Sequence, residues 1–340
     1  MAQHLAAPPP CPAPDDAHLH GLEFLWIELT NQCNLNCVHC YADSSPATKH
    51  RDALVRTDYE RLLREAADLG CRRLQFIGGE PTLSRDLPDL IHEARRLAFH
   101  DIEIFSNLTR LDPALLRASR AGSVRYATSI YARDPDRHAE VTRSPGSHGR
   151  TIENLKRLLD SGVAVRASVI GIHQSDPEIE DTVRFLADIG VTQISVDRVR
   201  SFGRGREAAA MPRKRELCGN CWRRSLCVSS DASVSLCIMS RDWPVGDVSK
   251  HSLRAIVAAQ DTITLRREIY DASPFSPSVP IEAGGCGPCG PADCGPIWPC
   301  GPRDCGPTVN CNPNQCGPTS QCSPYWCQPA FGRAAATHRT

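Results

Sequence analysis

The residues best suited to chemistry in this sequence are three closely spaced cysteines, Cys33, Cys37 and Cys40. Cysteine thiolates are good ligands of iron, and a [4Fe–4S] cube offers four irons for ligation. A local set of three thiolates therefore leaves one iron open to a small chelating molecule. A zinc site or three inert thiols are the alternatives, although structural zinc normally takes four protein ligands.

Further candidate binding residues follow apolar runs downstream of the cysteines. In Gly78–Gly79–Glu80–Pro81, two glycines allow the backbone to approach a ligand closely, and the carboxylate can accept a hydrogen bond from an ammonium group. Four more polar residues lie at or after the ends of later apolar runs: Ser106, Asn107, Ser129 and Arg143. No residue is nominated as a general acid or base, because the candidates are too many to rank.

Thirteen of the 18 cysteines lie at or beyond Cys218. One group is Cys218, Cys221, Cys227 and Cys237, and a second is Cys286, Cys289, Cys294 and Cys300. From Cys294 onwards, cysteines recur with an eleven-residue period, and Pro follows two residues after nearly every one. This repeat is incompatible with regular helix or sheet; a turn-rich wrap, extra metal binding and disorder all remain open.

These residues need a scaffold, and the sequence between residues 24 and 199 predicts one. Short runs rich in Val and Ile predict buried parallel strands, at Phe24–Leu29, Arg73–Ile77, Ile102–Ser106, Val124–Ile130, Val163–Ile170 and Gln193–Val199. Helical patterns separate them, at Asp58–Leu69, Leu87–Ala98, Pro113–Ala121, Gly149–Ser161 and Pro177–Ile189. A further helix is expected within Ser252–Asp271. Six strand–helix units in series predict an α/β fold with a parallel sheet curled into an open barrel, whose ligands bind at the carboxyl ends of the strands.

The overall composition excludes several classes of protein. Lys+Arg and Asp+Glu balance at 39 each, which gives no sign of a nucleic-acid groove or an anionic membrane surface. The first fourteen residues lack a signal peptide, and no stretch reaches the ~20 apolar residues of a membrane span. A cytoplasmic protein is therefore expected, in which many cysteines indicate metal or redox chemistry rather than disulfides.

Cys33-x3-Cys37-x2-Cys40 after a first strand resembles the cluster motif of the radical SAM superfamily, with His39 at a usually aromatic position. The resemblance implies a partial (β/α)6 barrel whose open iron binds the amino and carboxylate groups of S-adenosylmethionine (SAM). Reductive cleavage of SAM would then give a 5′-deoxyadenosyl radical. The resemblance also implies SAM contacts from Gly78, Gly79, Glu80, Ser106, Asn107, Ser129 and Arg143.

The region after the barrel resembles the SPASM and twitch domains, which hold one or two auxiliary [4Fe–4S] clusters. The hairpin region 218–237 carries the matching cysteines, with Ala232 where a glycine is usual at the turn. Cys286, Cys289, Cys294 and Cys300 resemble the second set with altered spacing. The number of clusters stays open, and structural zinc is the alternative. The expected domains are a disordered lead (1–22), the barrel (23–206), the SPASM/twitch-like domain (207–300) and a Cys/Pro tail (301–340).

The leading functional hypothesis is a radical SAM enzyme that installs a crosslink, thioether or epimerised centre in a ribosomally made peptide. Only about 23 residues precede the first strand, so the precursor peptide would be expected to need either a separate leader-recognition protein or docking on the barrel itself. The second hypothesis is oxidation or another step on a small molecule in natural-product or cofactor biosynthesis, and the third is a non-catalytic metal-binding protein. Both enzymes would need an electron donor such as flavodoxin or ferredoxin.

Overall fold

The computed structural model describes residues 19–49, 52–120, 122–206, 214, 217 and 220–272. The expectations for the N-terminal lead before residue 19, for Cys218 and for everything beyond residue 272 lie outside the described residues. That last stretch includes Cys286, Cys289, Cys294, Cys300 and the Cys/Pro repeat.

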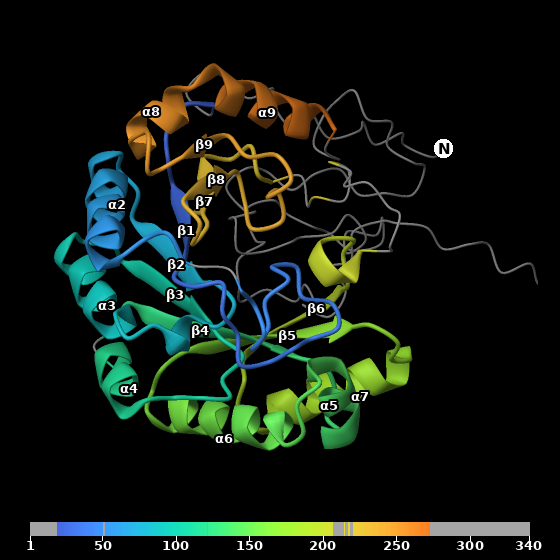
Figure 1. Ribbon diagram of the computed structural model, residues 1–340. Coiled ribbons are helices and arrows are strands. Elements are labelled where there is room, and N and C mark those ends of the chain that lie inside the picture. The colour runs from blue at the N-terminus through green and yellow to red at the C-terminus, as the bar shows by residue number, and fades with distance from the viewer. Residues whose placement is uncertain are drawn as a thin grey trace, which may run out of the picture.

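Strands and helices alternate through the first part of the chain, as the sequence predicts (Figure 1). The first six strands are β1 (Phe24–Glu28), β2 (Arg73–Ile77), β3 (Asp101–Phe105), β4 (Val124–Ile130), β5 (Val165–Gly171) and β6 (Gln193–Arg198). The helices between them are α2 (Arg56–Asp68), α3 (Leu87–Arg96), α4 (Pro113–Ser119), α5 (Pro135–Thr142), α6 (Ser147–Asp160) and α7 (Asp176–Asp188). Short 3-10 turns follow β2 and β6, at Pro81–Leu83 (η1) and Gly203–Gly205 (η2).

Helix α5 is the one element of this region that the sequence does not predict. Pro135 begins it, and the Asp134 carboxylate caps it by accepting hydrogen bonds from the backbone N–H groups of Asp136 (3.0 Å) and Arg137 (2.9 Å). Both are typical start signals of a helix. With eight residues, and with His138 and Thr142 among its buried side chains, α5 shows no apolar stripe.

Among the described residues, one nine-stranded sheet has the order β6-β5-β4-β3-β2-β1-β7-β8-β9. All neighbours from β6 to β7 (Ser225–Val228) are parallel, and β8 (Ser233–Ser235) and β9 (Gly246–Asp247) continue antiparallel. The hairpin that we expected to belong to a separate domain therefore extends the same sheet, because β7 pairs with β1. The α/β fold with a mainly parallel sheet is confirmed.

Ala232 lies at the turn of this hairpin in a backbone conformation that favours glycine. Ala232 has φ of 75° and is only 2% exposed. An L-residue in this left-handed conformation costs roughly 1–2 kcal/mol, which a glycine avoids. The fold therefore retains the turn in spite of the missing glycine.

The predicted C-terminal helix is two helices. They are α8 (Leu253–Ala258) and α9 (Gln260–Asp271), and the backbone of Ala259 between them is extended, with φ of −65° and ψ of 141°. The Thr262 hydroxyl donates to the carbonyl of Ile256 at 2.6 Å, and the backbone N–H of Ala259 donates to the same carbonyl at 3.2 Å, so the start of α9 is tied to the end of α8.

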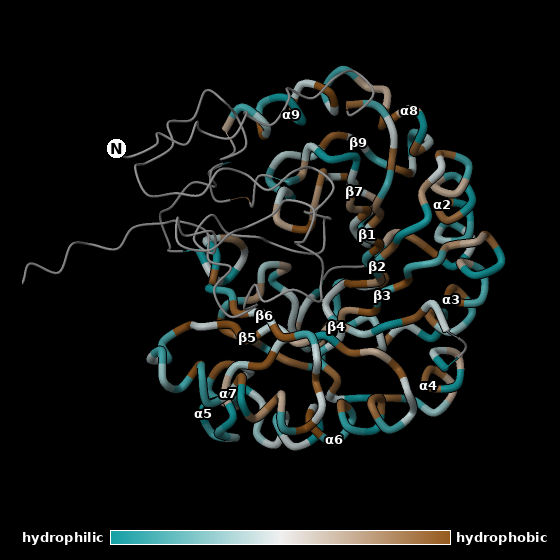
Figure 2. The backbone as a smooth tube through the Cα atoms, turned by 180° about the vertical axis from the view of Figure 1, so that it is seen from behind, coloured by the Kyte–Doolittle hydropathy of each residue, from teal (hydrophilic) through white to brown (hydrophobic). Residues whose placement is uncertain are grey.

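The two faces of the sheet differ in polarity. Ile104 is fully buried and in register with Tyr126, whose hydroxyl lies 3.0 Å from that of Ser119 in α4, so this face lies under the helices. Because successive strand residues point to opposite faces, Glu103 and Arg125 lie on the other face, which we call the inner face. Figure 1 shows α2 to α7 along the outer side of the curved sheet, and Figure 2 shows the hydrophobic residues concentrated where strands and helices pack. None of the described helices is long and apolar enough to cross a membrane.

Candidate functional site

The three cysteines of the first motif lie in the loop 30–44, which follows the carboxyl end of β1 and which we call the cysteine loop. Cys33 is buried, and Cys37 and Cys40 are half-buried. The backbone N–H of Leu35 donates to Cys33 Sγ at 3.4 Å, and that of Ser44 donates to Cys40 Sγ at the same distance. Donors aimed at sulfur favour the thiolate form that metal binding requires.

The donor set of this loop fits an iron–sulfur cube better than a single metal ion. Burial raises the pKa of Cys33 to about 12 and that of Cys37 to about 11, so these thiols need the positive charge of a metal to lose their protons at neutral pH. Within the described residues, no three His, Cys, Asp or Glu side chains converge on one point as ligands of a single ion would. Thiolates are also the donors that hold iron–sulfur clusters in proteins.

The two glycines after β2 hold the first part of the cysteine loop. The N–H of Gly79 donates to the carbonyl of Thr30 at 2.8 Å, and the N–H of Glu80 donates to that of Gln32 at 2.9 Å. Gly78 has φ of 146°, and a Cβ there would overlap the Thr30 carbonyl, just as one at Gly79 would overlap that of Gln32. Glycine is therefore required at both positions for the two loops to pack backbone to backbone.

The Glu80 carboxylate is completely buried and joins the loops after β2 and β3. Its Oε1 accepts from the Thr82 backbone N–H (3.1 Å) and hydroxyl (2.7 Å) and from the Ser106 hydroxyl (2.7 Å). Its Oε2 accepts from the backbone N–H of Asn107 at 2.8 Å. Burial raises the pKa of Glu80, and these four hydrogen bonds oppose that shift.

Asn107 connects this carboxylate to the cysteine loop. Its side-chain amide donates to Asn34 Oδ1 at 2.9 Å and lies 3.8 Å from Cys33 Sγ. Five predicted site residues, Gly78, Gly79, Glu80, Ser106 and Asn107, are thus brought together with Cys33 by direct contacts.

Two predicted site residues remain apart from this cluster. Ser129 is half-buried in β4, in register with Ser168 of β5. Arg143 is exposed at the C-terminal end of α5, with φ of 51°. Among the described residues, neither side chain makes a hydrogen bond or an ion pair with the cysteine loop, and their roles stay predictions.

A buried tyrosine that the sequence analysis did not single out supports the middle of the cysteine loop. The rings of Tyr131 and His39 meet edge to face, with 5.0 Å between centroids, and the Tyr131 side chain also hydrogen-bonds Cys37. The end of α5 adds two backbone bonds, from Asn36 N–H to the Thr142 carbonyl (3.2 Å) and from Val38 N–H to the Val141 carbonyl (2.9 Å). The unpredicted helix is therefore part of the site.

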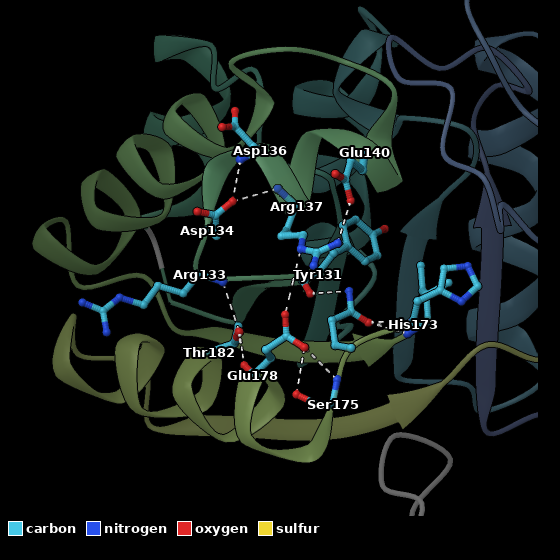
Figure 3. A network of polar contacts seen from close by, with 12 residues as sticks. Tyr131, Arg133, Asp134, Asp136, Arg137, Glu140, His173, Ser175, Glu178 and Thr182 are labelled. Atoms are coloured by element: carbon cyan, nitrogen blue, oxygen red, sulfur yellow. Dashed lines mark hydrogen bonds and ion pairs between the residues drawn. The ribbon is translucent and has the colours of Figure 1, made fainter.

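Figure 3 shows what holds Tyr131 in place. The side chain of Gln174 donates to the Tyr131 carbonyl at 3.0 Å, and the backbone of Arg133 donates to the Thr182 hydroxyl at 3.0 Å. Gln174, just before α7, and Thr182, in the middle of α7, thereby anchor the loop after β4, and that loop anchors the cysteine loop.

The inner face of the sheet carries a charged cluster below the site. Glu103 is fully buried and accepts from Arg166 at 2.7 Å and from Arg125 at 2.8 Å. Burial alone would raise the pKa of Glu103, but the two arginines lower it overall. Gln75 also donates to Glu103, so the carboxylate is fully partnered.

At the edge of the site, Glu28 forms a buried ion pair with Arg241, a residue that follows the hairpin. The Arg241 guanidinium also lies 5.5 Å from the ring centre of Tyr41, next to Cys40. Long-range contacts of this kind leave no signal in the sequence, because Glu28 and Arg241 are 213 positions apart.

Three cysteines of the second group lie together under the hairpin. Cys221, Cys227 and Cys237 are buried, and the sulfurs of Cys221 and Cys237 are 2.9 Å apart. Burial raises the pKa of Cys227 well above its ordinary value. Cys71 is buried elsewhere, at the end of α2, where its thiol donates to the carbonyl of Arg73 at 3.3 Å.

A parallel α/β sheet with a three-cysteine loop at its carboxyl edge defines a class of protein, and comparison with known proteins identifies that class. Residues 27–186 match the family model described as Radical SAM superfamily. This stretch of the chain is therefore a radical SAM domain, and that family implies a [4Fe–4S] cluster and SAM as cofactors.

The curated relatives indicate a particular branch of the superfamily. A probable GTP 3',8-cyclase of Methanothermobacter thermautotrophicus is 30% identical over 158 residues, which is 46% of this chain and 50% of that protein. The GTP 3',8-cyclase of Aquifex aeolicus is 29% identical over 175 residues, or 50% of this chain and 55% of that protein. The chain thus spans about half the length of the curated relatives it matches.

Solved structures share the fold at low sequence identity. Streptococcus suis SuiB bound to S-adenosylmethionine superposes with a TM-score of 0.62 at 16% identity, covering 73% of this chain and 68% of that one. The enzyme anSMEcpe with bound AdoMet gives 0.57 at 11% identity, covering 73% of this chain and 81% of that one.

These comparisons correct the leading functional hypothesis. The prediction of a peptide-modifying enzyme is wrong, because the curated relatives are named for a reaction of GTP, a small molecule. The SPASM-like cysteines suggested peptides by association with other relatives, whereas the sequence of the barrel itself is similar to the cyclases. The small-molecule alternative fits better.

Proposed function

We propose that this protein is a radical SAM enzyme that acts on a small polar molecule, with purine nucleotides as the first class to test. The observation that carries the proposal is the similarity of the barrel to GTP 3',8-cyclases over about half of the chain.

In this proposal, Cys33, Cys37 and Cys40 hold the cluster, which with SAM supplies a carbon-centred radical for hydrogen abstraction. Gly78 and Gly79 keep the cysteine loop against the loop after β2. Glu80 fixes the backbone of Asn107 at 2.8 Å, so that its amide stays beside Cys33. The role of these residues is to position the site and to exclude water from Cys33.

We also propose an auxiliary cluster at Cys221, Cys227 and Cys237. Three buried thiols under one hairpin are a donor set suited to iron. The pairing of β7 with β1 supports this role, because Trp26 and Cys227 are in register and the hairpin therefore adjoins the sheet that carries the cysteine loop. A one-electron donor such as flavodoxin or ferredoxin is the partner that the chemistry requires.

The protein is first reconstituted anaerobically with iron and sulfide, and the iron and sulfide bound per chain are quantified. The cluster is then reduced with dithionite and examined by electron paramagnetic resonance. SAM is then added, and 5′-deoxyadenosine is quantified with GTP, with ATP, with a neutral sugar and without substrate. We expect a cubane signal and 5′-deoxyadenosine formation that GTP or ATP increases.

The control is a triple variant, C33A/C37A/C40A, matched by Cys71→Ala, which removes a buried thiol outside the site. The triple variant should lose the product and the share of the iron and of the signal that belongs to the cluster of the cysteine loop, and Cys71→Ala should keep all three. A cluster-loaded protein that forms no 5′-deoxyadenosine under any condition contradicts the proposed chemistry. Product formation that no nucleotide increases contradicts the proposed substrate class.

A further inference from the structure

The short segment after β6 packs directly on the cysteine loop. Gly203, with φ of 54°, lies so close to the carbonyls of Cys40 and Tyr41 that a Cβ would overlap both. The next residue, Arg204, donates its backbone N–H to the Cys40 carbonyl at 2.9 Å. In Figure 1, this yellow segment lies beside the blue loop.

The Arg204 guanidinium binds the loop at three further points. Its Nε donates to the Cys37 carbonyl at 2.9 Å, its Nη1 to Asp43 at 2.8 Å and its Nη2 to the Ser44 carbonyl at 2.6 Å. The loop is therefore fastened on both sides of Cys40. Only arginine offers such a rigid fork of donors, since lysine presents a single point charge.

The same side chain brings a positive charge to the cysteines. The Arg204 side chain is 24% exposed, while its counter-ion Asp43 is 70% exposed and so is largely screened by water. A cation close to an iron–sulfur cluster stabilises its reduced form, because reduction makes the cluster more negative.

We propose that Arg204 is a positioning residue that fastens the cysteine loop around the cluster and raises the reduction potential of that cluster. This inference rests on the proposed function, because it requires a cluster at Cys33, Cys37 and Cys40. The two parts of the inference can be tested separately. The hydrogen bonds from the Arg204 guanidinium retain the cluster, and the charge of the guanidinium sets the reduction potential of the cluster.

The test uses the reconstituted full chain and measures two quantities other than activity. They are the rate of iron loss to a chelator and the midpoint potential from a redox titration followed by electron paramagnetic resonance. Arg204→Gln should lose iron at least about tenfold faster, since one hydrogen bond to a charged group is already worth about a factor of ten, and its potential should become more negative. Arg204→Lys should lose iron as fast as Arg204→Gln, with a potential closer to that of the wild type.

Two further variants keep the proposal falsifiable even if Arg204→Gln folds poorly. Asp43→Asn leaves the contacts with the two carbonyls and removes a negative charge, so iron retention should stay within about twofold and the potential should become less negative. Arg206→Gln is the matched control, because Arg206 pairs with Asp242 at 2.7 Å rather than with the loop.

If the Arg204 variants and Asp43→Asn retain both the iron and the potential of the wild type, the inference is overturned. A wild-type protein that takes up no cluster at all instead refutes the proposed function, so the two failures are distinguishable.

Discussion

The buried carboxylate of Glu80 gives the most direct test of how the site is organised. Replacement by alanine removes the acceptor of four hydrogen bonds. The hydroxyls of Thr82 and Ser106 can rotate toward other acceptors, but the backbone N–H groups of Thr82 and Asn107 cannot. Each buried donor left without a partner costs about 1–3 kcal/mol, so Glu80→Ala should lower the free energy of unfolding by about 2–6 kcal/mol.

This loss is measurable in the metal-free protein by thermal unfolding. In a domain of this size, 1 kcal/mol corresponds to about 2–4 °C in Tm, so Glu80→Ala should lower Tm by about 4–24 °C. Glu80→Gln keeps one acceptor oxygen and should lose about half as much. Glu140→Ala is the control, since Glu140 is 65% exposed and its pair with Arg137 should be worth no more than about 0.5 kcal/mol.

The same variants should weaken SAM binding to the reconstituted protein, because Asn107 loses its anchor beside Cys33. If Glu80→Ala shifts Tm by no more than the Glu140→Ala control, the carboxylate does not organise the two loops and the reasoning is refuted. A large shift in Tm with unchanged SAM affinity would instead limit Glu80 to a structural role.

Four further predictions concern other parts of the site and fold. Gly79→Ala should lower the free energy of unfolding by about 1–3 kcal/mol and lower iron uptake in reconstitution, because its Cβ meets the cysteine loop. Gly149→Ala in α6, where nothing lies within 4 Å of the added Cβ, should instead raise the free energy of unfolding by about 0.5–1 kcal/mol. Equal effects of the two substitutions would contradict this prediction. The folded-state pKa of Glu103 is lowered, so its contribution to stability is present above about pH 4.3 and is lost as the pH falls through the folded pKa. Denaturant unfolding from pH 7 to pH 3 should therefore show a flatter pH dependence for Glu103→Gln than for the wild type, and parallel curves would exclude this role. Ala232→Gly should raise Tm by about 1–3 °C, because relief of the left-handed strain exceeds the added chain entropy; a lower Tm would show that the turn is unstrained. Cys71→Ala should leave the iron content unchanged, and a loss of iron would make that thiol a ligand.

Local sequence patterns were sufficient to predict much of the scaffold. The residue ranges of β2 and β4 agree with the prediction, and the other four strands differ by one or two residues at their ends. The reason is that buried parallel strands are short apolar runs bounded by glycine and polar residues, and both features are local. Helix α5 was not predicted from the sequence because its stability depends on a cap and on buried polar side chains rather than on an apolar stripe.

The sequence by itself also determined the chemistry of the site. Cys33, Cys37 and Cys40 lie within eight residues, and the Gly78–Glu80 motif follows the next strand, so residue type and spacing already indicate a cluster loop and its neighbour. Residue type and spacing did not indicate the substrate, and the resemblance to cysteine-rich peptide-modifying enzymes led to the wrong class of substrate. Similarity over about half of the chain, rather than any single motif, indicated the small-molecule relatives.

Only the tertiary structure decided what holds the cysteine loop. Glu80 faces the loop after β3, Tyr131 lies against His39, and Arg204 and Arg241 reach the cysteine loop from 160 or more positions away. The physical reason is that parallel strands gather their carboxyl ends at one edge, where distant side chains meet. Each of these contacts depends on strand order, including the pairing of β7 with β1, and strand order is not encoded in any local pattern.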